Sequence, residues 1–199
     1  MACQKLVQKL QAANMPALCQ GITSASSWYH RTYPVIATQF GSGPDKNAPP
    51  PTPSSQCIRT LLVSSWVATI LTPQFSSADV SHYVEATSAF RSQRSVSNPD
   101  GLSSIWTLAN KLVNEGTAAN VATVSKLLHF DMPLVFPMLD RRVARKLGLS
   151  VPPSFNDYKD YIECLISLQA NYPTLWNSIV VNAGAASVPP LRIIDAILF

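Results

Sequence analysis

A lysine amine and an aspartate carboxylate, Lys126 and Asp140, flank an apolar passage that holds two prolines. A neutral lysine amine is a nucleophile that can attack a sugar carbon and form a Schiff base. A carboxylate can stabilise the positive charge that develops on such a carbon and can help to activate the nucleophile. The pair therefore predicts covalent chemistry at an electrophilic carbon.

Four of the fifteen Lys and Arg residues follow Asp140 directly, at Arg141, Arg142, Arg145 and Lys146, whereas the others are scattered. Eleven Asp and Glu residues leave a net charge of +4, which favours an anionic partner without requiring one. The first two arginines would begin a helix, where the helix dipole disfavours cations, so Asp140 or a phosphate is expected to hold them. The other interpretation is a solvated helix face.

Helical periodicity recurs along almost the whole chain, and the alternation typical of strands is scarce. Hydrophobic residues make up 47% and charged residues 13% of the 199 residues, so one substantial core is expected. We predict an all-α fold, a compact bundle of about eight to ten helices in a single domain over residues 1–199. The Pro-rich segment 41–55 is predicted to be an exposed loop.

Local signals set several helix boundaries. Asp140 is placed to N-cap a short helix that Gly148 ends, and Ser154 with Asp157 forms a variant capping box before a long helix. The segment 57–71 is predicted to be the most buried helix, closed by a proline.

The four cysteines, Cys3, Cys19, Cys57 and Cys164, lie far apart, with no CxxC pair and no histidine at zinc spacing. Neither a metal site nor a disulfide framework is expected from them. The longest apolar run is broken by polar residues and is shorter than the ~20 residues that span a bilayer. We therefore expect a reduced, cytoplasmic protein with no membrane segment and no metal or organic cofactor.

The stretch 136–149, FPMLDRRVARKLGL, resembles a segment of the helix-hairpin-helix DNA glycosylases, the superfamily of endonuclease III and 8-oxoguanine glycosylase. In that segment a proline and apolar residues lead into a catalytic aspartate, and a helix with Val and Arg and then Leu-Gly-Leu follow. Asp140 falls on the catalytic aspartate, and 122–128 falls on the hairpin and the start of its second helix. Lys126 matches the lysine nucleophile of the bifunctional members. The likeness is to a divergent branch, closer to the short bacterial proteins similar to 8-oxoguanine glycosylase.

The resemblance implies a DNA glycosylase that removes a damaged or modified base. If Lys126 forms a Schiff base, the enzyme would also have a lyase step. Asp140 would be its electrostatic partner, and DNA would bind through the basic segment 141–146. Such an enzyme flips its nucleotide into a pocket. The aromatic run 28–30, or Trp106, is a candidate for the pocket wall.

Two other interpretations stay open. In one, the chain is a catalytically silent helical protein that keeps the scaffold and binds DNA or another protein. Ala122, Val124 and Ser125 stand where the family has its glycine-rich hairpin, which fits a scaffold that has lost its chemistry. In the other, the match is chance on an unrelated bundle.

Each candidate residue also has a purely structural interpretation. Asp140 can be only an N-cap, and Lys126 can be a solvated side chain on a helix. His129, after two leucines, is typical of a core histidine, and Arg192 with Asp195 is typical of a local ion pair.

Overall fold

The computed structural model describes residues 2–23, 28–40, 52–66, 76–91, 93, 96, 101–113 and 121–199. These ranges hold α-helices and no strand, which confirms the predicted all-α class. Eleven helices are present in them, one more than the upper end of the expected range. They are α1 (Ala2–Ala12), α2 (Met15–Thr23), α3 (Trp28–Gln39), α4 (Pro53–Trp66), α5 (Ser77–Arg91), α6 (Leu102–Val113), α7 (Val121–Asp131), α8 (Arg141–Leu147), α9 (Phe155–Asn171), α10 (Pro173–Ala185) and α11 (Pro190–Leu198).

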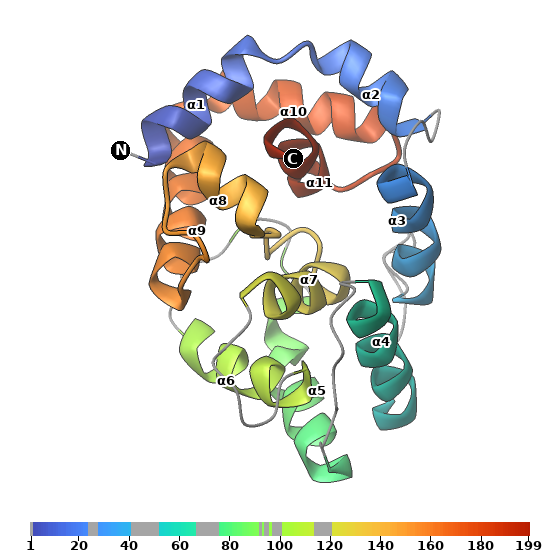
Figure 1. Cartoon of the computed structure of the whole chain (residues 1–199). Helices are drawn as coiled ribbons and strands as arrows, with labels where there is room; N and C mark the ends of the chain where they lie inside the picture. The colour runs from blue at the N-terminus through green and yellow to red at the C-terminus, as the bar shows by residue number, and fades with distance from the viewer. Residues whose placement is uncertain are drawn as a thin grey trace.

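The helices pack as two groups. Both ends of the chain form one group, in which α1 and α2 contact α8–α11, and α4–α7 form the other. Helix α3 contacts α2 in the first group and α4 in the second. Figure 1 shows the first group at the top, with the C-terminal α11 beneath α1 and α2, and the second at the bottom. The connection from α7 to α8 therefore carries the chain from one group to the other.

The apolar helix face that was predicted for the first helix is buried in the core. Helix α1 buries Leu6, Val7 and Leu10, which recur at helical spacing on one side of the helix. The core continues through both groups, from Leu6 in α1 to Val80 in α5. None of the helices in the described ranges is long and apolar enough to cross a bilayer.

Two sequence predictions in the second group need correction. Residues 53–55, expected in the exposed loop, form the first turn of α4, and residues 41–51 of that loop lie outside the described residues. Of the segment 57–71, which was predicted to be the most buried helix, residues 67–71 lie outside the described residues. The part in α4 is not the most buried, because Ile58 and Leu61 are 57% and 50% exposed. The helix instead turns Arg59 inward, where this guanidinium pairs with Asp131.

The cysteines also differ from the prediction. A disulfide joins Cys3 of α1 to Cys164 of α9, whereas Cys19 and Cys57 are free thiols. The expectation of four reduced thiols is therefore wrong for this pair. Sequence spacing could not reveal it, because the bond closes a separation of 161 residues between helices that pack side by side.

A buried charge cluster ties the second group together. The carboxylate of Asp131, at the end of α7, is fully buried and accepts two hydrogen bonds from Arg91 of α5, at 2.7 and 2.6 Å. It also accepts a hydrogen bond from the Tyr83 hydroxyl at 3.0 Å and a longer one from Arg59 at 3.4 Å. One carboxylate thus pairs with two guanidiniums, from α4 and α5.

We predict that Asp131→Asn lowers the free energy of unfolding by about 3–5 kcal/mol, because it leaves two nearly buried guanidiniums without a counter-charge. Urea unfolding monitored by circular dichroism measures this change. Asp160→Asn, on the exposed surface of α9, is the matched control and should leave the free energy nearly unchanged. Equal effects of the two substitutions would contradict the role given to Asp131.

Candidate functional site

Hydrogen bonds between Ser125 and Leu139 bring the backbone at Lys126 near the backbone at Asp140. The Leu139 amide donates to Ser125 Oγ at 3.0 Å, and the Ser125 hydroxyl lies 3.3 Å from the Leu139 carbonyl. Ser125 is fully buried and directly precedes Lys126, as Leu139 directly precedes Asp140. The contact therefore joins the helix that carries the lysine to the chain that carries the aspartate.

The rest of the connection between α7 and α8 is also fixed. His129 Nδ1 lies 2.8 Å from the Phe136 carbonyl, and the Tyr158 hydroxyl of α9 donates to the Pro137 carbonyl at 3.0 Å. The segment itself is largely buried, with Val135 and Phe136 almost inaccessible. Asp140 is thus held by packing from both groups of helices.

Asp140 caps α8 as predicted. Its Oδ1 accepts from the backbone amides of Arg142 and Val143, at 2.8 and 2.9 Å, and Gly148 ends the helix in the left-handed conformation at φ 74°. Asp140 Oδ2 makes no hydrogen bond to any residue in the described part of the chain. The structural role therefore uses one carboxylate oxygen and leaves the other for a ligand.

Lys126 is half-buried on α7 and is not the fully solvated side chain of the structural interpretation. Burial lowers the pKa of its amine, because removal of water disfavours the charged form. The nearby Asp140 and Asp195 carboxylates oppose this shift and the Arg192 guanidinium adds to it, but burial dominates. A larger share of this amine is therefore neutral, and so nucleophilic, than of an exposed lysine at the same pH.

A polar cluster lies next to this lysine. His129 is fully buried, and since its Nδ1 faces a carbonyl it carries the hydrogen there, which leaves Nε2 to accept from the Tyr33 hydroxyl at 2.9 Å. The Arg192 guanidinium lies over the Tyr33 ring, 4.6 Å from its centre, and forms a buried ion pair with Asp195. The predictions of a core histidine and a local ion pair are confirmed. The closeness of the Arg192–Asp195 pair to Lys126 was not predicted, because α7 and α11 are far apart in sequence.

The four basic residues after Asp140 are all exposed on α8, but their contacts differ. The Arg142 guanidinium stacks on the ring of the C-terminal Phe199 at 4.4 Å, a partner that the sequence did not suggest. Lys146 lines a hollow that it shares with Lys9 of α1. Arg141 is exposed at the capped start of the helix, and Arg145 is exposed further along it.

Of the aromatic candidates for a pocket wall, Trp106 does not line this place. Trp106 is buried in the core, with its ring 4.8 Å from Phe155 and 5.0 Å from Tyr158. Residues 28–30 lie in α3, and their side chains are outside the described part. The two hollows described in this structure are lined by residues other than Lys126 and Asp140.

Among the described residues, no three His, Cys, Asp or Glu side chains come together as a metal site would require. Comparisons of the chain with protein-family models, with curated proteins and with solved structures found no match. The site must therefore be interpreted from its own geometry.

We predict that His129 makes the fold less stable as the pH falls from about 6.5 to about 4. Burial lowers the pKa of this imidazole to about 4, from an ordinary value near 6.5. In that range the unfolded chain binds a proton that the native state excludes, so the free energy of unfolding decreases, by roughly 3 kcal/mol over the whole range.

Urea unfolding at pH 7, 6 and 5 measures this loss, above the pH at which carboxylates titrate. NMR titration of the imidazole reports the pKa directly. A native-state midpoint near 6.5, with stability constant over this range, would contradict the prediction.

Proposed function

We propose that the chain is a DNA glycosylase with an associated lyase step, in which Lys126 is the nucleophile and Asp140 its electrostatic partner. The observation that carries the proposal is the half-buried Lys126 amine, which feels the charge of the Asp140 carboxylate, together with the Asp140 oxygen that the helix cap does not use. The resemblance of 136–149 to the helix-hairpin-helix glycosylases supports the same assignment of roles.

The reaction needs a neutral amine and a stabilised cation. The lone pair of Lys126 Nζ attacks C1′ of the nucleotide, the bond from C1′ to the base breaks, and the base leaves with that electron pair and takes up a proton. Loss of a proton from nitrogen and opening of the sugar ring, with protonation of its oxygen, then give a Schiff base. The Asp140 carboxylate stabilises the positive charge that develops on the sugar before the new bond is complete.

The position of the site between the two helix groups fits this proposal. Lys126 comes from the second group, α4–α7, and Asp140 leads into α8 of the first group. A flipped nucleotide would be held between these two residues. The exposed basic side chains of α8 start directly at the aspartate and suit the phosphates of DNA.

The cysteines bear on the compartment in which the protein works. The scattered cysteines favoured the cytoplasm, but the Cys3–Cys164 disulfide weighs against a reducing compartment, because disulfides persist mainly in oxidising ones.

Borohydride trapping on duplexes with oxidised, deaminated or alkylated bases tests the chemistry. We expect a covalent protein–DNA adduct with the wild type and none with Lys126→Ala, because borohydride reduces only the Schiff base that this amine forms. Lys159→Ala, on α9, is the matched control and should still give the adduct.

Asp140→Asn separates the two roles of the aspartate. Asparagine keeps an oxygen that can cap α8, so stability should change little, whereas base release should fall by about 100-fold or more because the charge is lost. Asp140→Ala should lower both. Absence of any adduct and of base release on every duplex would contradict the proposal and favour a silent DNA- or protein-binding scaffold.

A further inference from the structure

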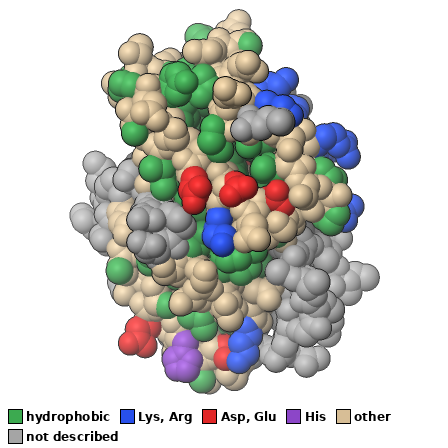
Figure 2. All heavy atoms as spheres, turned by 90° about the vertical axis from the view of Figure 1, so that its left-hand side faces the viewer, with side chains coloured by type: hydrophobic (Ala, Val, Ile, Leu, Met, Phe, Trp, Pro, Cys, Tyr) green, Lys and Arg blue, Asp and Glu red, His purple; other side chains and the backbone are tan. Residues whose placement is uncertain are grey.

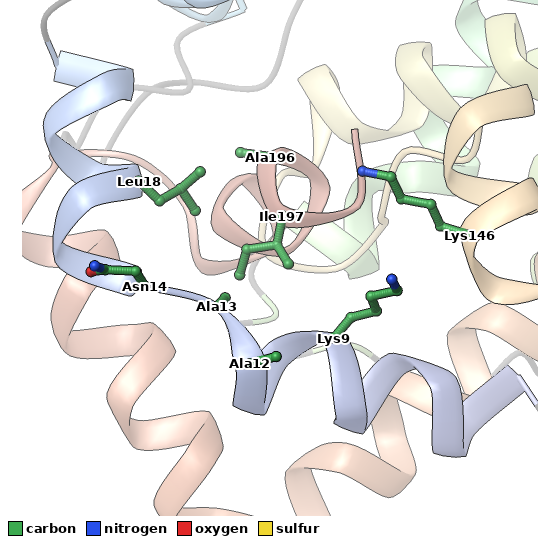
Figure 3. A pocket seen from close by; sticks show the side chains of 8 residues that line it. All are labelled: Lys9, Ala12, Ala13, Asn14, Leu18, Lys146, Ala196 and Ile197. Atoms are coloured by element: carbon green, nitrogen blue, oxygen red, sulfur yellow. The ribbon is translucent and has the colours of Figure 1, made fainter.

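A hollow of about 430 Å³ lies between α1, the start of α2, α8 and α11, away from Lys126. Its apolar part consists of short or aliphatic side chains, and Asn14 contributes an amide. Figure 3 shows Lys9 and Lys146 reaching toward the same space from α1 and α8. The full lining is Lys9, Ala12, Ala13, Asn14, Leu18, Lys146, Ala196 and Ile197.

The charge of this hollow is unbalanced. Two ammonium groups from different helices face it, and no acidic side chain is among the described residues that line it. Like charges that share one space repel each other, so an anion placed between them is favoured. The hollow therefore suits a negatively charged ligand.

A third lysine extends the basic surface. Lys5 lies one turn before Lys9 on α1, and its ammonium rests against Gly148, where a Cβ would collide with it. This position at the end of α8 is favourable for a cation, because helix carbonyls point toward it. Helices α1 and α8 thus present their lysines on one side of the molecule.

Basic side chains are concentrated at one edge of this face. In Figure 2, Asp and Glu side chains cross the middle of the face, whereas several Lys and Arg side chains gather near one upper edge. A polyanion that binds at the basic edge would avoid the acidic band.

We propose that the hollow between α1, α8 and α11 holds the sugar–phosphate backbone of DNA, with a phosphate between Lys9 and Lys146. This inference rests on the proposed function, since it extends the DNA contact of α8 onto α1. The alanines of the hollow let a bulky backbone approach closely, and the aliphatic side chains suit the apolar edges of its sugars.

The axial distance from Asp140 to Lys146 is short on the scale of a DNA strand. Asp140 and Lys146 are separated by about 9 Å along the helix axis, at 1.5 Å a residue. A duplex strand advances 3.4 Å a nucleotide along its axis, so a few nucleotides cover this distance. The hollow therefore binds the backbone a short way from the nucleotide that reaches Asp140.

Fluorescence anisotropy with a labelled duplex, measured at several salt concentrations, tests the inference. Each lost phosphate contact should reduce the slope of log affinity against log salt by about 0.9. Lys9→Gln and Lys146→Gln should each show this reduction and bind more weakly at low salt, whereas Lys159→Gln on α9 should match the wild type.

Charge insertion gives a second test that removes no basic residue. Ala13→Glu places a carboxylate in the hollow and should weaken DNA binding at least tenfold at low salt. Ala170→Glu changes the net charge equally on the exposed surface of α9 and should have a much smaller effect. Circular dichroism of both variants verifies that they fold.

The outcomes distinguish this inference from the proposed function. DNA binding with an unchanged salt slope in Lys9→Gln would overturn the inference and leave the glycosylase proposal standing. Binding reduced as expected, without any trapped Schiff base, would support the inference and contradict the chemistry. NMR shift changes at Lys9 and Lys146 with inorganic phosphate, but none with the duplex, would overturn the assignment to a nucleic acid.

Discussion

The hydrogen bonds between Ser125 and Leu139 are the constraint on which the site depends. They fix the chain that leaves α7 against the helix it has just left. The residues that follow each partner, Lys126 and Asp140, therefore lie near each other along the backbone, at the boundary between the two helix groups. His129 repeats the same arrangement one turn later through the Phe136 carbonyl. A buried, hydrogen-bonded connection of this kind holds polar groups in place that a solvated loop would leave mobile.

Burial gives the site its chemical character. The Asp140 and Asp195 carboxylates favour the protonated amine of Lys126, but the cost of removing water from it is larger, so its pKa is lowered. The Arg192–Asp195 pair contributes a positive and a negative charge to the same environment, and the Tyr33 ring under Arg192 keeps that pair away from solvent. The C-terminal helix α11 therefore belongs to the site.

Much of the fold could be predicted from the sequence, because local signals determine it. The apolar spacing in α1, the Asp140 cap, the Gly148 stop and the Ser154 capping box are properties of neighbouring residues, and all are confirmed. Contacts between distant helices have no such signal. The Cys3–Cys164 bond and the approach of α11 to Lys126 follow from the tertiary packing, and the inward turn of Arg59 follows from a carboxylate on another helix.

The central claim is that burial lowers the pKa of the Lys126 amine, so that more of it is neutral than of an exposed lysine, and NMR titration of selectively labelled lysines tests it most directly. We expect the Lys126 pKa to lie below the ordinary lysine value, and to fall further in Asp140→Asn, because the carboxylate that favours the charged amine is lost. A Lys126 pKa at or above about 10.4, the ordinary value for an exposed lysine, would contradict the account.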